Sequence, residues 1–109
     1  MLRLFITISI VSGVCGAAAS LAHGRSLVEE GKAFVETNCS GCHAIGTTGT
    51  STHPDAPAFR TLSQRYPIDT LAEALAEGIS TGHPDMPEFV ASPQQIDAIL
   101  AYIESVQAK

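Results

Sequence analysis

Cys39-Ser40-Gly41-Cys42-His43 is the stretch of this 109-residue chain that decides which fold to expect. It places two cysteines three positions apart, with a histidine directly after the second. Thiols at this spacing can add to the two vinyl groups of a porphyrin, and the adjacent imidazole can offer a nitrogen to its iron. The pentapeptide therefore predicts one haem c, covalently bound through Cys39 and Cys42, with His43 as one axial ligand of the iron.

Three other kinds of site use some of the same residues. A thioredoxin-like dithiol also has the C-x-x-C spacing, but it needs a βαβ context, and no convincing strand pattern lies nearby. A zinc site could recruit both cysteines and two histidines, although the adjacent Cys42 and His43 fit poorly at two corners of one tetrahedron. An exported cysteine pair can also form a disulfide, and the histidine that follows is what favours haem attachment.

The N-terminus has the pattern of a secretory signal peptide. Arg3 is followed by an apolar run over residues 4–14 and then by the small residues of the segment 17–22. We expect residues 1–22 to be a signal peptide that is cleaved after Ala22, with residues 23–109 forming one domain in the periplasm. An uncleaved membrane anchor is the alternative, because the apolar stretch approaches the length that spans a bilayer.

The charge balance of the chain is acidic. Six Lys and Arg face eleven Asp and Glu, a net charge of −5, and loss of Arg3 with the leader would make it −6. This argues against nucleic acid or an anionic membrane as a partner and favours a redox partner with a basic docking face. The 87 residues left after cleavage of 22 from 109 make one small domain, whose core a buried, covalently held haem would stabilise.

Helix patterns dominate the remainder of the chain. Ser26 and Glu29 form a capping-box pattern that predicts a helix from about Ser26 to Asn38. A second such pattern, Ser92-Pro93-Gln94-Gln95, predicts the last helix. A third helix is expected from about Thr70 to Glu77 with Gly78 at its end, and a helical turn from Thr61 to Arg65. The apolar stripe of the first helix contains Leu27, Val28, Phe34 and Val35. That of the last helix contains Ile96, Ile99, Leu100, Ile103 and Val106.

Two proline-rich segments, 53–59 and 83–89, share the pattern H-P-D-x-P-x-F and are predicted to be loops. They differ at the central position, which is Ala56 in the first copy and Met86 in the second. Met86 is the only methionine outside the leader, and Met with His is the ligand pair of electron-carrying cytochromes. We therefore predict Met86 as the sixth iron ligand. The alternatives are His83, His53 or an open sixth position.

These features together resemble the class I, mitochondrial-type mono-haem cytochromes c of bacteria. The resemblance rests on Gly31, the Cys39–His43 motif, Met86-Pro87 and Tyr102. It implies that residues 23–109 are a cytochrome c domain with a small all-α fold, in which three or more helices wrap around one covalently attached haem. The N- and C-terminal helices would cross, with a glycine and an aromatic residue at the contact. Where the family usually has an aromatic residue four before the first cysteine, this chain has Val35.

The resemblance also implies the surroundings of the cofactor. A proline carbonyl would face the free ring nitrogen of His43, with Pro57 as the best match and Pro54 as the second. Arg60 or Arg65 could pair with a haem propionate, and a solvated surface arginine is an equal alternative for each. Within this family, a histidine and a methionine hold the iron in both oxidation states.

The expected function is therefore that of a soluble one-electron carrier and not an enzyme. Its partners would be a redox donor and acceptor, such as a dehydrogenase, an oxidase or a reductase. We expect a monomer with no stable membrane insertion after signal cleavage. The alternatives are an electron-transfer subunit of a dehydrogenase complex, or a small haem enzyme with an open sixth position.

Overall fold

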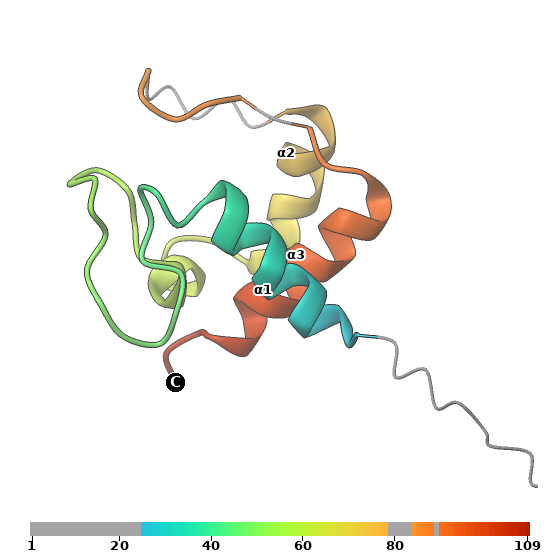
Figure 1. Ribbon diagram of the computed structural model, residues 1–109, viewed down its shortest axis with the longest axis horizontal. Coiled ribbons are helices and arrows are strands. Elements are labelled where there is room, and N and C mark those ends of the chain that lie inside the picture. The colour runs from blue at the N-terminus through green and yellow to red at the C-terminus, as the bar shows by residue number, and fades with distance from the viewer. Residues whose placement is uncertain (1–24, 79–83, 89) are drawn as a thin grey trace, which may run out of the picture.

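The computed structural model of the protein describes residues 25–78, 84–88 and 90–109. The signal peptide predicted at residues 1–22, and His83, lie outside these ranges. The described secondary structure is helical (Figure 1), with no strand in these ranges: α1 (Leu27–Asn38), the 3₁₀ helices η1 (Phe59–Gln64) and η2 (Ile68–Thr70), α2 (Leu71–Glu77) and α3 (Pro93–Ser105). This confirms the all-α prediction. None of the described helices has both the length and the apolar character to cross a membrane.

Both long helices begin at the capping boxes that the sequence predicts. At the start of α1, the Ser26 hydroxyl accepts from the Glu29 amide at 3.2 Å, and the Glu29 carboxylate accepts from the Ser26 amide at 2.9 Å. Ser92 and Gln95 repeat this reciprocal arrangement at the start of α3, with Pro93 as its first residue. These bonds satisfy amides that have no partner inside the helix, which fixes where each helix starts.

Helices α1 and α3 cross closely at Gly31 (Figure 1). A Cβ atom at this position would overlap the Ala98 carbonyl and would lie 2.8 Å from the Cβ of Tyr102. One turn further along α1, Val35 is 0% exposed. The crossing that the family resemblance implies, with a glycine and an aromatic residue at the contact, is thereby confirmed.

The hydrophobic core lies between α3, α1 and the two 3₁₀ helices. The predicted apolar stripe of α3 is confirmed, but that of α1 is wrong in its first turn, where Leu27 is 52% and Val28 38% exposed. Since α3 meets α1 at Gly31 and beyond, the first turn extends past the contact. The buried core residues are Val35, Phe59, Leu62, Ile68, Leu75, Ala91, Ile96, Ile99, Tyr102, Ile103 and Val106.

The segments between α1 and α3 differ slightly from the predicted boundaries. The helical turn expected from Thr61 is η1, which begins two residues earlier at Phe59 because the Phe59 ring is part of the core. The helix expected from Thr70 begins with the 3₁₀ turn η2 and continues as α2. Gly78 follows α2 with a φ of +95°, a conformation that favours glycine.

The contact at Gly31 generates a prediction about stability. Gly31→Ala should lower the free energy of unfolding by about 2–3 kcal/mol, because the added methyl group meets backbone atoms of α3 that cannot rotate away. This loss should appear although alanine is the better helix former. Chemical denaturation of the haem-loaded protein measures it. Gly46→Ala, at a glycine with open space around its Cβ position, is the control and should change little. Equal stability of Gly31→Ala and the wild type would contradict the close crossing.

Candidate functional site

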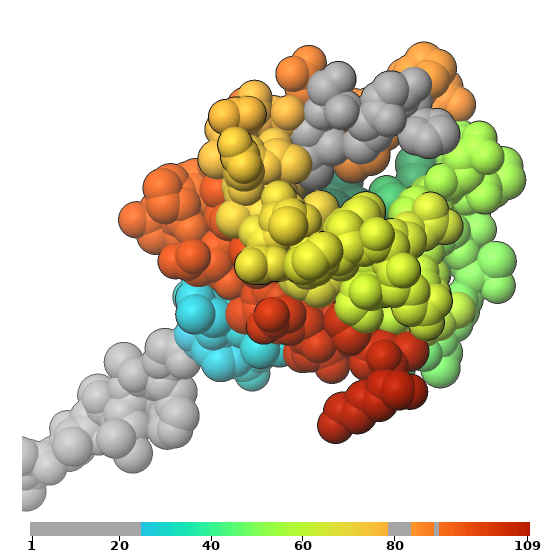
Figure 2. All heavy atoms as spheres, turned by 180° about the vertical axis from the view of Figure 1, so that it is seen from behind, coloured from blue at the N-terminus to red at the C-terminus, as the bar shows by residue number. Residues whose placement is uncertain are grey.

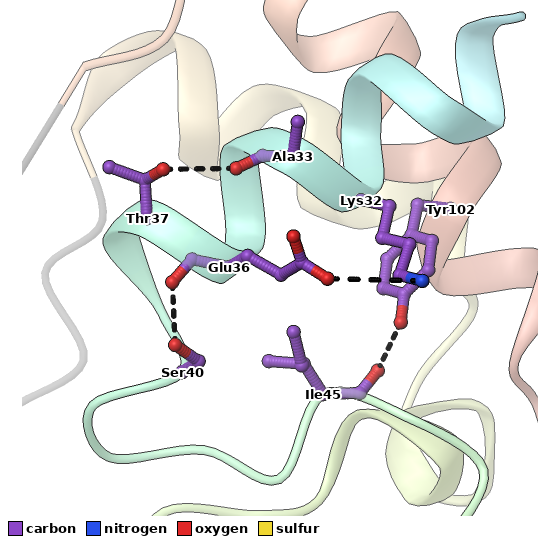
Figure 3. Close-up of polar contacts among 7 residues, drawn as sticks. All are labelled: Lys32, Ala33, Glu36, Thr37, Ser40, Ile45 and Tyr102. Carbon is purple, nitrogen blue, oxygen red and sulfur yellow. Dashed lines mark hydrogen bonds and ion pairs between the residues drawn. The ribbon is translucent and has the colours of Figure 1, made fainter.

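The Cys39–His43 motif forms a tight turn directly after α1. The amides of Cys39 and Ser40 both donate to the Val35 carbonyl, at 2.8 and 3.0 Å, so the chain leaves the helix in a compact turn. The Ser40 hydroxyl donates to the Glu36 carbonyl at 2.5 Å (Figure 3). The His43 amide then donates to the Cys39 carbonyl at 3.0 Å. The structure therefore brings the two cysteines and the histidine together within one turn of backbone.

Both cysteines of the motif are free thiols and half-buried. Burial raises the pKa of Cys39 to about 11, so this sulfur remains a protonated thiol at neutral pH. The pair thus offers two sulfur atoms for thioether formation.

His43 is oriented by a backbone carbonyl on the far side of the adjoining loop. Its Nδ1 lies 2.7 Å from the Pro57 carbonyl oxygen. A carbonyl only accepts, so Nδ1 carries the hydrogen and the lone pair is on Nε2. The contact between a proline carbonyl and this histidine, with Pro57 and not Pro54 as the acceptor, is confirmed. The ring also packs against Phe59, with ring centroids 5.1 Å apart.

The loop after His43 is fastened to α3 and to the motif. The buried Tyr102 of α3 donates its hydroxyl to the Ile45 carbonyl at 2.9 Å (Figure 3). The Thr52 hydroxyl donates to the Gly41 carbonyl at 2.6 Å, which ties the other end of this loop to the motif. Burial, with the charge of Glu36 as a smaller cause, raises the pKa of Tyr102. Tyr102 therefore stays protonated as a donor over a wide pH range.

The segment carrying Met86 is linked to the motif through His53. The His53 amide donates to the Cys42 carbonyl at 3.2 Å, while its ring Nε2 lies 3.1 Å from Oδ2 of Asp85, the residue before Met86. The Met86 side chain is half-buried. The sequence indicates His53 only as an alternative ligand, and this link to Asp85 is not predicted from it. The repeated H-P-D pattern, which puts a possible donor (His53) in one copy and a possible acceptor (Asp85) in the other, was the signal that could have revealed it.

The described region around η1 contains a hollow and one buried nitrogen without a hydrogen-bond partner. Figure 2 shows a hollow beside the yellow-green atoms of η1 and η2, with teal atoms visible at its floor. Nη1 of Arg60 is buried and has no hydrogen-bond partner among the described residues. A buried N–H group needs an acceptor, which the oxygen of a haem propionate would supply. Arg65 is exposed, so burial separates two arginines that the sequence alone leaves equivalent.

The residues present therefore fit haem c better than they fit a zinc ion. Two free thiols, one imidazole nitrogen and one buried arginine nitrogen without a described partner match the vinyl groups, the iron and a propionate of haem. In contrast, no group of three or more His, Cys, Asp or Glu that could hold a metal ion occurs within ranges 25–78, 84–88 and 90–109. The zinc alternative has no support in this part of the chain.

Comparison with known proteins agrees with this donor set. A family model described as Cytochrome c matches residues 28–107. A cytochrome c oxidase subunit 2 of Alkalihalophilus pseudofirmus is 30% identical over an alignment of 99 residues, which covers 76% of this chain and 27% of that protein. The chain thus spans about a quarter of the length of this relative. No solved structure matches the chain.

The Tyr102 hydroxyl generates a prediction with a pH dependence. Tyr102→Phe should lower the free energy of unfolding by about 1–2 kcal/mol at neutral pH, because the Ile45 carbonyl loses its donor. Since the folded-state pKa is raised above the ordinary value of 10.0, the unfolded chain releases this proton first. The wild type therefore loses this stabilisation as the pH rises from 10.0 toward the folded pKa, and the variant does not.

Denaturation curves at a series of alkaline pH values measure this difference, which should narrow with rising pH. Tyr66→Phe changes an exposed tyrosine and should follow the wild type throughout. A Tyr102→Phe difference that stays constant into strong alkali would contradict the assigned role of the hydroxyl.

Proposed function

The chain belongs to the cytochrome c family, and from this premise we propose that it carries single electrons between two redox proteins outside the cytoplasm. In this proposal Cys39 and Cys42 attach one haem c, and His43 and Met86 are the axial ligands of its iron. One observation carries most of the weight. The Pro57 carbonyl oxygen lies 2.7 Å from Nδ1 of His43 and accepts its hydrogen. The lone pair of Nε2 is therefore available to a metal, close in sequence to two free thiols.

The residues that would surround the haem have separate roles in this proposal. When bound, haem supplies an iron that gains or loses one electron. The two cysteine sulfurs tether it, so that it cannot be lost from an exported protein. The Pro57 carbonyl accepts the N–H of His43, which fixes the tautomer and increases the donor strength of Nε2. Arg60 would pair with a propionate, whose oxygen would give its buried Nη1 an acceptor.

Met86 is proposed as the sixth ligand because His53, the alternative ligand in the described loops, already has hydrogen-bond partners at its ring nitrogens. Both ring nitrogens of His53 have partners, the Asp55 amide at 3.1 Å and the Asp85 carboxylate at 3.1 Å. The thioether of Met86 lies next to Asp85 in the same loop. A thioether favours ferrous iron relative to a second imidazole and so raises the reduction potential. Two protein ligands leave no position for a substrate, which supports a carrier in preference to an enzyme.

The charges around the proposed haem-binding loops favour a basic partner. Neither residues 33–59 nor residues 66–108 contain a Lys or Arg. The exposed Asp55, Asp85 and Glu88 lie in the two loops that would border the haem. A partner with a basic face would be steered to this side of the molecule. We further propose export by the predicted signal peptide, residues 1–22, to the periplasm, where the mature chain acts as a soluble monomer.

A second form of the same function has one observation in its favour. The relative from Alkalihalophilus pseudofirmus is a subunit of a cytochrome c oxidase, and this chain matches 27% of it. A domain of this kind can thus be part of a larger redox protein. The alternative proposal is that this chain is a dedicated electron-transfer subunit of a complex, with an oxidase or a dehydrogenase as its fixed partner.

Substitution of Met86 tests the ligand set and the carrier function together. The ferric wild type should show the weak near-infrared charge-transfer band of thioether-bound iron, and Met86→Ala should abolish it. The reduced variant should bind carbon monoxide rapidly and completely, because its sixth position is open, whereas the wild type should resist. Glu88→Ala, an exposed change in the same loop, should behave as the wild type does. A wild type without the band, or with rapid carbon monoxide binding, would contradict the proposal.

The attachment of haem is tested by serine substitutions at the two cysteines. Cys39→Ser or Cys42→Ser alone should keep haem attached through one remaining thioether. The double variant should lose all covalent haem, because neither sulfur remains. Haem staining of denaturing gels and the mass of the intact protein measure this. Ser40→Ala, inside the same motif, is the control and should keep both bonds; haem that survives denaturation in the double variant would overturn the assignment.

A further inference from the structure

We propose that His53 is a positioning residue, which ties the Met86 loop to the haem-attachment motif and so limits how often the Met86 thioether leaves the iron. This inference rests on the proposed function, because it concerns the sixth ligand. It uses the feature of the sequence that the electron-transfer proposal leaves unexplained, the repeated H-P-D-x-P-x-F pattern. The histidine of the first copy binds the aspartate of the second, across 32 residues of sequence.

The hydrogen-bond pattern of the ring defines its protonation. Nδ1 of His53 accepts from the Asp55 amide at 3.1 Å, and an amide always carries its hydrogen. The Nδ1 atom must therefore be unprotonated, and the ring hydrogen is on Nε2. This N–H donates to Oδ2 of Asp85 at 3.1 Å. The contact of Nδ1 with the Asp55 amide thus orients the ring, so that the N–H of Nε2 points to Asp85.

The backbone of the same residue extends the connection to the motif. The His53 amide donates to the carbonyl of Cys42, which directly precedes His43. One residue therefore joins the neighbour of one proposed axial ligand to the neighbour of the other. Any movement of the Met86 segment away from the motif must break the bond between His53 and Asp85 or carry His53 with it.

The chain around Met86 makes this bond consequential. Residues 78–92 connect α2 with α3, and the Ala91 amide fixes the base of this connection by donating to the Leu75 carbonyl at 2.9 Å. The bond to Asp85 is a further fixed point, directly next to Met86 in the chain. The His53 side chain is 27% and the Asp85 side chain 72% exposed, so water competes for the bond. We therefore expect an effect of about two- to five-fold on loop opening.

Two substitutions at His53 separate its two ring nitrogens. His53→Asn keeps an acceptor close to the Asp55 amide, as in an Asx-turn, but is too short to reach Asp85. His53→Gln places an amide donor close to the position of Nε2 and can restore the bond to Asp85. Asp85→Ala removes the acceptor. Asp55→Ala is the matched control, because it removes the same charge at the equivalent position of the other repeat. The contact of Asp55 with His53 is made by its backbone amide, which the substitution keeps.

The experiment measures binding of imidazole to the ferric, haem-loaded protein by absorption spectroscopy. Imidazole competes with the Met86 thioether, so its apparent affinity reports how often the sixth position opens. His53→Asn and Asp85→Ala should each raise this affinity about two- to five-fold. The imidazole affinity of His53→Gln should be close to that of the wild type, and the affinity of Asp55→Ala should equal that of the wild type. Amide hydrogen exchange over residues 84–88 should accelerate by a similar factor in the first two variants only.

The outcomes distinguish this inference from the proposed function. If Met86→Ala does not raise imidazole affinity, Met86 is not the ligand and the proposed ligand set fails together with this inference. If Met86→Ala raises the affinity while His53→Asn and Asp85→Ala equal the wild type, the ligand set stands and the role of His53 is overturned. An Asp55→Ala effect as large as that of Asp85→Ala would also overturn it, because charge and not the bond would then be the cause.

Discussion

The contact of α1 with the backbone of α3 at Gly31 is the constraint on which the other features depend. No side chain separates the two helices there, so their axes approach more closely than at an ordinary helix contact. The crossing fixes the position of α1 relative to α3, and the Cys39–His43 motif follows directly after the end of α1. It also brings Tyr102 of α3 within reach of the loop behind His43. Packing in the core thus determines where the chemistry is placed.

The proposed site is assembled from segments that hold one another mainly through backbone groups. The motif, the Pro57 segment and the loop behind His43 are joined by carbonyl acceptors at Pro57, Ile45 and Cys42. The Met86 segment is the exception, because it is held to the others by two side chains, His53 and Asp85. The side of the proposed site that contains His43 is thus joined through main-chain acceptors, whereas the link between His53 and the Met86 segment joins two side chains.

The parts of the fold that could be predicted from sequence are those with local causes. Capping boxes act within four residues, so the starts of α1 and α3 were predictable. The motif also carries its chemistry within five consecutive residues. The exposure of Leu27 was not predictable from helical periodicity, because periodicity describes the direction of a side chain but not how far the facing helix extends.

Long-range pairings marked the limit of the sequence-based prediction. The bond between His53 and Asp85 joins two loops whose relative placement depends on every helix between them. Similarly, Arg60 and Arg65 have the same chemistry, and only the packing around η1 buries the Nη1 atom of Arg60 and leaves Arg65 exposed. The acceptor for His43 was predictable because the family resemblance supplied the tertiary contact that local patterns lack.

The identity of that acceptor has an evolutionary consequence. The oxygen that faces His43 belongs to the main chain of Pro57, so every amino acid at position 57 would carry the same atom. Point mutations there can shift the oxygen but cannot delete it. Insertions or deletions between the motif and position 57, which reroute the polypeptide, are the changes able to remove it. During evolution, the contact with His43 should therefore tolerate replacement of the side chain at position 57 better than changes in the length of the loop between the motif and this position.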